Sequence, residues 1–175
     1  MEPAPQYPRF RPAGDTGLVV ELGDGVSLSV NRQVRALDRR IAAAEIAGIL
    51  ETQPTNRSLF ILYEPLAIAA SELCRAVERL IADLPETPDE SGCRAWIIPA
   101  IYGGEYGVDL ALAAARLGME PAALAARHAA RTYSVFMIGF QPWFAYLGEL
   151  DPALAVSRHG EPRPLVPAGT ISIAG

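Results

Sequence analysis

Residues 58–63 read Ser-Leu-Phe-Ile-Leu-Tyr, and this short apolar run between Arg57 and Glu64 predicts a buried β-strand. Apolar side chains recur at helical spacing on both sides of it. An amphipathic helix is expected after the strand, over residues 66–84, and another before it, from Asn31 to about Ile49. The first half of the chain therefore alternates helix and strand around residues 58–63.

Two more strands are expected near the start of the chain, over residues 16–22 and 26–30. Asp24-Gly25 between them is a strong hairpin signal, because Gly readily adopts positive φ. The first ten residues are rich in Pro and are expected to form a loose arm, and Asn31 is the expected N-cap of the first helix. The order β-β-α-β-α predicts an α+β fold with helices on one face of a sheet.

Residues 85–92, rich in Pro and charge, are the most linker-like stretch and predict two domains, residues 1–90 and 93–175. The elements expected beyond the linker are a strand, an Ala-rich helix, a short helix and a second strand, over residues 94–101, 108–117, 120–128 and 133–138. Residues 139–175 hold ten Gly or Pro among 37 positions and show no helical periodicity. This tail predicts the short strands and tight loops of a β-barrel or sandwich.

The composition excludes several kinds of chemistry. The chain has 175 residues and a net charge of −5, and all 15 of its basic residues are Arg. Without Lys it can carry no phosphate-loop Lys, no Schiff-base Lys and no biotinyl-lysine. The acidic balance disfavours a nucleic-acid partner. Two Cys and two His fit no common metal spacing, so no metal site is expected.

The chain is expected to be cytoplasmic and to have no membrane partner. No apolar stretch reaches the roughly 18 to 20 residues that a membrane span needs. Residues 1–6, Met-Glu-Pro-Ala-Pro-Gln, lack the basic and then apolar pattern of a secretory signal.

Four segments could carry chemistry, and each has a structural alternative. His128 is either an acid–base residue or a structural one favoured by a helix C-terminus. Residues 102–107, Tyr-Gly-Gly-Glu-Tyr-Gly, either bind an anion through backbone N–H groups or form a strand-to-helix turn that needs positive φ. The aromatic residues 139–147 form either an exposed binding surface or core. Arg158 and Arg163 either bind a carboxylate or phosphate in bidentate fashion or point into solvent.

The order of these segments resembles a known family, that of the B subunit of 5-oxoprolinase. The family is also called allophanate hydrolase subunit 1, or carboxyltransferase subdomains C and D, and it includes an inhibitor of a sporulation histidine kinase. The residues that carry the resemblance are His128, Tyr133, Val135, Gly139-Phe140, Pro142, Phe144, Tyr146-Leu147, Leu150-Asp151-Pro152, Arg158, Pro162-Arg163 and Val166-Pro167-Ala168-Gly169-Thr170. Further matches are residues 102–110, Asn31 with Val34, and residues 59–65, so the resemblance covers essentially the whole chain.

The resemblance implies a small N-terminal α/β sandwich-like domain followed by a cyclophilin-like β-barrel. It implies the B subunit of an ATP-dependent 5-oxoprolinase, which works with the C and A subunits of that enzyme to convert 5-oxoproline to glutamate. ATP would be used through that complex. Two other roles stay open: a non-enzymatic inhibitor that binds a sensor histidine kinase, and the carboxyltransferase half of a urea carboxylase, to which another domain brings biotin.

The resemblance also implies which residues form the site. His128 is the expected catalytic residue, and Arg158 and Arg163 are expected to bind a substrate carboxylate or a phosphate. The other expected substrate-binding residues are Phe140, Tyr146 and Gly169. All of these except His128 lie in the tail that is rich in Gly and Pro.

The sequence departs from the family pattern in two places. Trp143 stands where the family's Gly-Phe-x-Pro-Gly-Phe loop has its second Gly, a position where positive φ or close approach to a ligand would favour Gly. Family members also continue beyond the match to residues 166–170, whereas this sequence stops at Gly175, so the barrel is expected to be incomplete. An opened barrel exposes unpaired strand edges. We therefore expect the chain to be inactive alone and to self-associate or require its partner.

Overall fold

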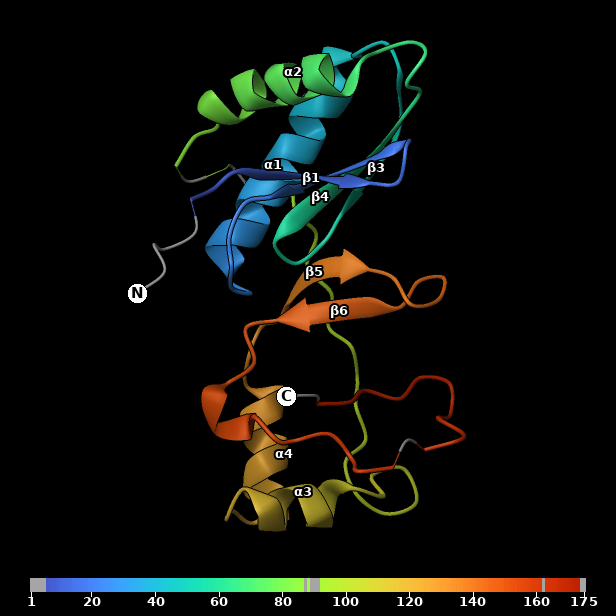
Figure 1. Ribbon diagram of the computed structural model, residues 1–175. Helices are drawn as coiled ribbons and strands as arrows, with labels where there is room; N and C mark the ends of the chain where they lie inside the picture. The colour runs from blue at the N-terminus through green and yellow to red at the C-terminus, as the bar shows by residue number, and fades with distance from the viewer. Residues whose placement is uncertain (1–5, 87, 89–91, 162, 174–175) are drawn as a thin grey trace, which may run out of the picture. The chain divides into compact units, whose positions relative to one another are not determined.

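The structure is a computed structural model, drawn as a ribbon in Figure 1. It describes residues 6–86, 88, 92–161 and 163–173. Positions 87 and 89–91 of the expected linker lie outside the described residues, as does Pro162 of the Pro162-Arg163 match.

The chain divides into two compact units, which are described separately. The first unit comprises residues 1–93 together with residues 134–148, and the second comprises residues 94–133 together with residues 149–175. The division therefore differs from a single cut between residues 90 and 93, because a hairpin from the second half of the chain belongs to the first unit.

The first unit is built on an antiparallel sheet of four strands in the order β1-β2-β4-β3. The strands are β1 (Arg9–Ala13), β2 (Gly17–Glu21), β3 (Ile49–Pro54) and β4 (Ser58–Tyr63). The strands predicted over residues 16–22 and 58–63 are confirmed as β2 and β4. They are the two central strands, and they pair with Val20 opposite Leu59 and Leu18 opposite Ile61.

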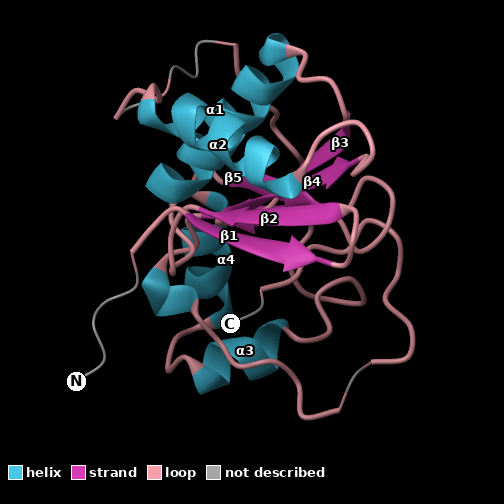
Figure 2. Ribbon diagram, turned by 45° about the horizontal axis from the view of Figure 1, so that its top comes forward, coloured by secondary structure: helices cyan, strands magenta, loops and turns pink. Residues whose placement is uncertain are grey.

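Two helices, α1 (Leu28–Ala44) and α2 (Ala70–Ala82), lie together on one side of these strands (Figure 2). Successive side chains of a strand point to opposite faces, so alternate residues of β2 and β4 face the helices. The core between the two layers is formed by Leu18, Val20, Val34, Leu37, Ile41, Leu59, Ile61, Tyr63, Ile68, Leu73 and Val77. The predicted α+β organisation with helices on one face of a sheet is confirmed for this unit.

The prediction of a hairpin through Asp24-Gly25 is wrong. Ser27 caps α1 instead, because its Oγ accepts a hydrogen bond from the backbone N–H of Val30 at 3.3 Å, and the helix begins at Leu28. Residues 28–30 are therefore helical, and β2 pairs with β1, which begins at Arg9 inside the segment expected to be a loose arm. A local cap thus prevails over a local turn signal.

The prediction that Asn31 is an N-cap is wrong. Its side chain is fully buried inside α1. Its Nδ2 donates to the backbone carbonyl of Thr55, between β3 and β4, at 3.1 Å, and to the carbonyl of Phe136 at 2.9 Å. Phe136 lies in β5 (Ser134–Ile138), which pairs with β6 (Ala145–Gly148) as an antiparallel hairpin. One buried amide therefore connects α1, the loop between β3 and β4 and this hairpin within the first unit.

The second unit consists mainly of helices and loops. Its elements are α3 (Leu110–Arg116), α4 (Pro121–Ala129) and a short 3-10 helix, η1 (Pro152–Leu154). The two predicted helices are confirmed, and Pro121 opens α4 at the first helical position, where its missing N–H has no intrahelical partner to lose. Ala114, Leu124 and Leu154 form the small buried core.

The strand predicted over residues 94–101 is wrong. These residues form no regular secondary structure, and Trp96 and Ile97 are 73% and 100% exposed. A strand exists only where another strand pairs with it, and no described segment pairs with residues 94–101. The described residues form one sheet of four strands and one of two, with no closed barrel, so the cyclophilin-like barrel is not confirmed.

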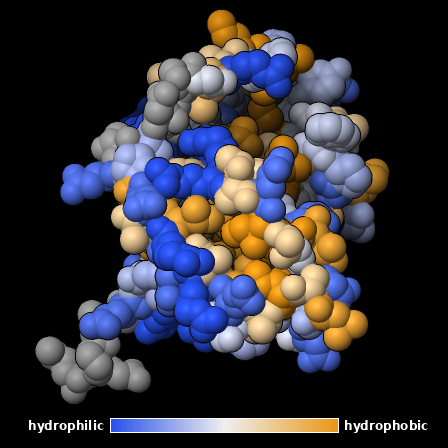
Figure 3. All heavy atoms as spheres, turned by 90° about the horizontal axis from the view of Figure 1, so that it is seen from above, coloured by the Kyte–Doolittle hydropathy of each residue, from blue (hydrophilic) through white to orange (hydrophobic). Residues whose placement is uncertain are grey.

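The surface of the described residues carries both hydrophilic and apolar side chains, as the face drawn in Figure 3 shows. The exposed apolar residues include Trp96, Ile97 and Ile98, before α3, and Phe140 and Trp143, between β5 and β6. None of the helices in the described part of the chain is both long and apolar enough to cross a membrane.

Candidate functional site

His128, the predicted catalytic residue, lies in the last turn of α4 between two tyrosines. The hydroxyl of Tyr102 is 2.5 Å from Nδ1 of His128, which is hydrogen-bonding distance. The hydroxyl of Tyr133 donates to the backbone carbonyl of His128 at 3.1 Å. The ring centroids of Tyr102 and Tyr133 are 5.8 and 5.2 Å from that of His128. The structure thus builds a compact group of three titratable rings.

Burial favours the neutral form of all three rings. It lowers the pKa of His128 below the ordinary value of a histidine, and it raises the pKa of Tyr102 and of Tyr133. A helix C-terminus favours a cationic imidazole, whereas burial, the cause of the lowered pKa of His128, favours the neutral ring. A neutral imidazole exchanges protons at physiological pH and suits acid–base chemistry.

The Gly-rich segment 102–107 is a tight turn that leads into α3 and carries Tyr102. Gly103 and Gly104 have φ of 84° and 57°, and the N–H of Gly107 donates to the carbonyl of Gly103 at 2.9 Å. A methyl group added at Gly107 would overlap the backbone of Gly103. The glycines are therefore required by the turn, as in the alternative that the segment is a turn needing positive φ. The residues before the turn do not form the expected strand.

Arg163, a predicted anion-binding residue, already binds an internal carboxylate. Its two terminal nitrogens donate to the two oxygens of Asp109 at 2.9 and 2.7 Å, and Nε2 of His159 is 3.4 Å from the same carboxylate. The Arg163 hydrogen bonds are the largest cause of the lowered pKa of Asp109. A substrate anion would have to displace Asp109 to reach this guanidinium.

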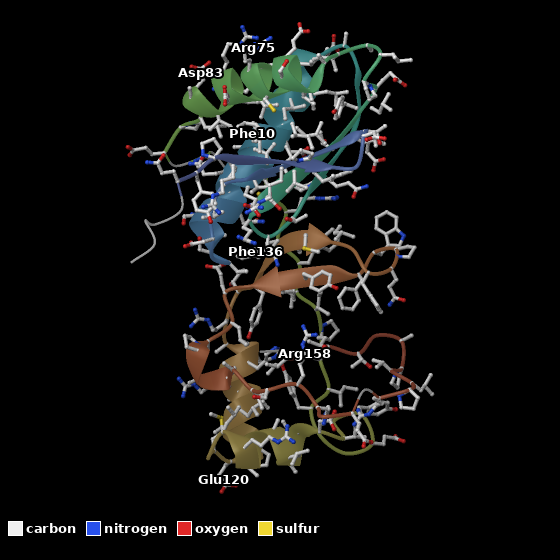
Figure 4. All side chains as sticks on the ribbon, viewed as in Figure 1. Phe10, Arg75, Asp83, Glu120, Phe136 and Arg158 are labelled. Carbon is white, nitrogen blue, oxygen red and sulfur yellow. The ribbon has the colours of Figure 1, made fainter. Side chains whose placement is uncertain are left out.

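Arg158, the other predicted anion-binding residue, is exposed and follows η1 in the chain (Figure 4). It lines a surface cavity of about 390 Å³ together with Arg116, at the end of α3, and Ser157. Neither arginine makes a hydrogen bond or an ion pair with any described residue. Sequence reasoning missed Arg116, because only folding brings the end of α3 beside the segment after η1.

The aromatic segment 139–147 comprises the connection between β5 and β6 and the first three residues of β6, in the first unit. Phe140 and Trp143 are 84% and 89% exposed, and both have positive φ, at 62° and 67°. Phe144 stands edge-to-face between Phe140 and Tyr146, with ring centroids 5.7 and 5.0 Å apart. The segment is therefore an exposed surface rather than core. Positive φ is unfavourable for any residue with a Cβ and concentrates at functional sites.

The six predicted site residues fall in both units. Phe140 and Tyr146 belong to the first, whereas His128, Arg158, Arg163 and Gly169 belong to the second. Gly169 has a φ of 80° and open space around its α-carbon, so its backbone conformation is what favours glycine there. No group of three or more His, Cys, Asp or Glu side chains in the described ranges is placed to hold a metal ion.

Replacing Trp143 by Gly is expected to raise the free energy of unfolding by about 0.5–1 kcal/mol, because glycine adopts this φ without strain and the exposed indole contributes little burial. Chemical denaturation of the two chains measures the difference. Gln141, exposed in the same loop at a φ that is not positive, is the matched control. Gln141→Gly should lower stability, and a loss of stability in both variants would contradict the strain at Trp143.

A family model described as "Carboxyltransferase domain, subdomain C and D" matches residues 8–175. Among curated proteins, the chain is similar to the 5-oxoprolinase B subunit of Escherichia coli O157:H7, at 36% identity over 93% of this chain and 72% of that protein. It is also similar to the 5-oxoprolinase B subunit of Bacillus subtilis (strain 168), at 32% identity over 93% of this chain and 71% of that protein.

Among solved structures, the chain is similar to that of TTHA0988, with a TM-score of 0.76 and 35% identity. The match covers 91% of this chain but 31% of the TTHA0988 chain. These similarities extend over both units and confirm the resemblance inferred from the residues. The chain belongs to the carboxyltransferase domain family, subdomain C and D, whose curated relatives here are named as the B subunit of 5-oxoprolinase.

Proposed function

We propose that this chain is the B subunit of an ATP-dependent 5-oxoprolinase that, with partner subunits, converts 5-oxoproline to glutamate. The observation that carries the proposal is the similarity to proteins of that name, at 32–36% identity over 93–94% of this chain. A family match over residues 8–175 supports it. No feature of the structure favours the kinase inhibitor or the urea carboxylase half over this role.

We propose that the partners are proteins like the C and A subunits of 5-oxoprolinase and that the complex is cytoplasmic. The relatives are named as one subunit of an enzyme, which implies an assembly of more than one chain. The exposed apolar residues support the proposal that a partner subunit covers part of this surface, since large apolar patches mark contacts with other molecules. Two segments carry highly exposed apolar side chains. One contains Trp96 and Ile97, and the other contains Phe140 and Trp143.

ATP is proposed to act through the complex rather than on this chain. A phosphate-binding loop presents free backbone N–H groups and usually a Lys. This sequence has no Lys, and its one Gly-rich turn uses the N–H of Gly107 internally, on the carbonyl of Gly103. The residues of this turn therefore do not fit a nucleotide phosphate.

The proposed roles within this chain follow the geometry. His128 is the candidate acid–base residue, because it is neutral, half-buried and held by Tyr102. Arg158 is the candidate for binding the carboxylate of 5-oxoproline or a phosphate, and Arg116 at the same cavity adds a second guanidinium. Arg163 can bind the substrate anion only if that anion displaces the carboxylate of Asp109. Phe140, Tyr146 and Gly169, and the cyclophilin-like barrel, stay predictions.

Co-expression with the two partner subunits, followed by an assay of 5-oxoproline-dependent ATP hydrolysis, tests the proposal. We expect the assembled complex to release phosphate only when 5-oxoproline is present, and this chain alone to release none. The matched control is the pair of partner subunits without this chain, which should be inactive. A complex that assembles but ignores 5-oxoproline would contradict the proposal. Inhibition of a histidine kinase, or biotin-dependent carboxylation of urea, would assign the chain to an alternative role.

A further inference from the structure

The contact between Tyr102 and His128 determines which ring nitrogen of His128 carries a proton. A neutral imidazole has one N–H and one bare nitrogen, and the hydrogen bond made by one nitrogen sets the state of the other. Tyr102 reaches Nδ1. In the described part of the chain, no residue forms a hydrogen bond with Nε2, so the phenol is the group that selects the tautomer.

Proton affinities give the direction of this hydrogen bond. A phenol is a proton donor with an ordinary pKa of about 10, and the bare nitrogen of a neutral imidazole is a stronger acceptor than a phenol oxygen. The favoured arrangement has the Tyr102 hydroxyl donating to Nδ1. The remaining ring proton then lies on Nε2.

The groups around His128 keep it neutral. The carboxylate of Asp151, at the start of η1, is bound by Arg127 at 3.0 Å and accepts from the N–H of Ala153 at 3.0 Å. Asp151 and Arg131 act on the pKa of Tyr133, but burial is what lowers that of His128. A carboxylate at Nδ1 would stabilise the imidazolium, whereas a phenol at Nδ1 stabilises the neutral ring.

We propose that Tyr102 is a positioning residue that fixes His128 as the neutral Nε2–H tautomer, so that His128 presents a hydrogen-bond donor, not a general base, to a carbonyl or oxyanion of the substrate. This inference rests on the proposed role of His128 in 5-oxoprolinase. It narrows the acid–base role proposed above to that of a hydrogen-bond donor through Nε2. Tyr133 contributes differently, since its hydroxyl holds the backbone carbonyl of His128 and not the ring.

Nitrogen NMR of the full chain labelled with ¹⁵N-histidine tests the proposal. The chain contains only His128 and His159, so His159→Gln assigns the signals. We expect Nδ1 of His128 to show the shift of a bare, hydrogen-bonded nitrogen and Nε2 that of a protonated one. In Tyr102→Phe, the Nδ1 signal should shift and the two tautomers should mix.

Tyr133→Phe is the matched control, because it removes a hydroxyl from the same cluster without touching the ring nitrogens, and it should leave the tautomer unchanged. A protonated Nδ1 in the unmodified chain would overturn the proposal, and this result does not depend on how the variants fold. Ring signals that are identical with and without the Tyr102 hydroxyl would overturn it as well. The readout involves no turnover, so failure of the 5-oxoprolinase assay and failure of the tautomer assignment are separate results.

Discussion

Replacing Gly148 by Ala is expected to lower the free energy of unfolding of the first unit by about 3 kcal/mol, the upper end of what overpacking a core usually does. A methyl group at Gly148 would overlap the ring of Phe136, which is 4% exposed and lies across the hairpin from it. A buried ring has little freedom to move. The hairpin of β5 and β6 must therefore distort, and with it the carbonyl of Phe136 that accepts from Asn31.

Denaturant unfolding of the variant beside Gly139→Ala measures this effect. Gly139 lies in the same hairpin, at a φ that is not positive, and a methyl group there would meet Met137 at 3.4 Å and Tyr146 at 3.8 Å, which are ordinary contacts. We expect a change below about 1 kcal/mol for this control. Equal stability of the two variants would show that Phe136 does not pack on Gly148.

Replacing Asn31 by Ala is expected to lower the free energy of unfolding by about 3 kcal/mol, through lost hydrogen bonds and a cavity. The change leaves the carbonyls of Thr55 and Phe136 without the amide that donates to them. It also removes a side chain that joins α1 both to the loop between β3 and β4 and to the hairpin. Hydrogen exchange should therefore accelerate in residues 134–148 more than in β2 and β4.

Gln33→Ala on the same helix is the control for Asn31. The Gln33 amide also donates to two backbone carbonyls, those of Pro85 and Glu86, at 2.9 and 3.0 Å, but these bonds are exposed. Water replaces exposed partners, so we expect a loss within about 0.5 kcal/mol. If Asn31→Ala is as mild as Gln33→Ala, the buried amide does not hold the hairpin in the first unit.

The central strands and the helices of the first unit could be predicted because their signals are local. Residues 59–63 are continuously apolar, and α1 and α2 repeat apolar residues at helical spacing. The edge strands could not be predicted. β1 contains Pro12 and β3 contains Pro54, which indicate breaks in a sequence but are tolerated where one side of a strand is unpaired.

For residues 94–101 the sequence predicts a strand that the structure lacks. Their apolar and β-branched composition is typical of a strand, yet a strand also needs a partner, and the pattern of one segment holds no information about pairing. The hairpin predicted at Asp24-Gly25 is wrong for a related reason. A turn signal leads to a hairpin only if the residues after it can form a strand. Ser27 commits them to α1 instead.

For the candidate site, the sequence indicated residue types but not their contacts. His128 stands out in the sequence as a titratable group, whereas its partner Tyr102, 26 residues earlier, stands out only as part of a Gly-rich segment. Asp109, which occupies the fork of Arg163, is 54 residues away in the sequence. Such pairs are created by tertiary packing, and no spacing rule in a single sequence gives them.

We predict that this chain supplies His128 to a 5-oxoprolinase complex, and the kcat of the assembled complex carrying His128→Phe tests this role. Phe keeps an aromatic ring between Tyr102 and Tyr133 but has no nitrogen. An acid–base group and a hydrogen-bond donor to an oxyanion each contribute at least about 100-fold to a rate. We predict that kcat falls by about that factor while the complex still assembles, and that His159→Phe changes kcat little. A His128→Phe complex that retains the kcat of the unmodified complex would show that His128 takes no part in the reaction.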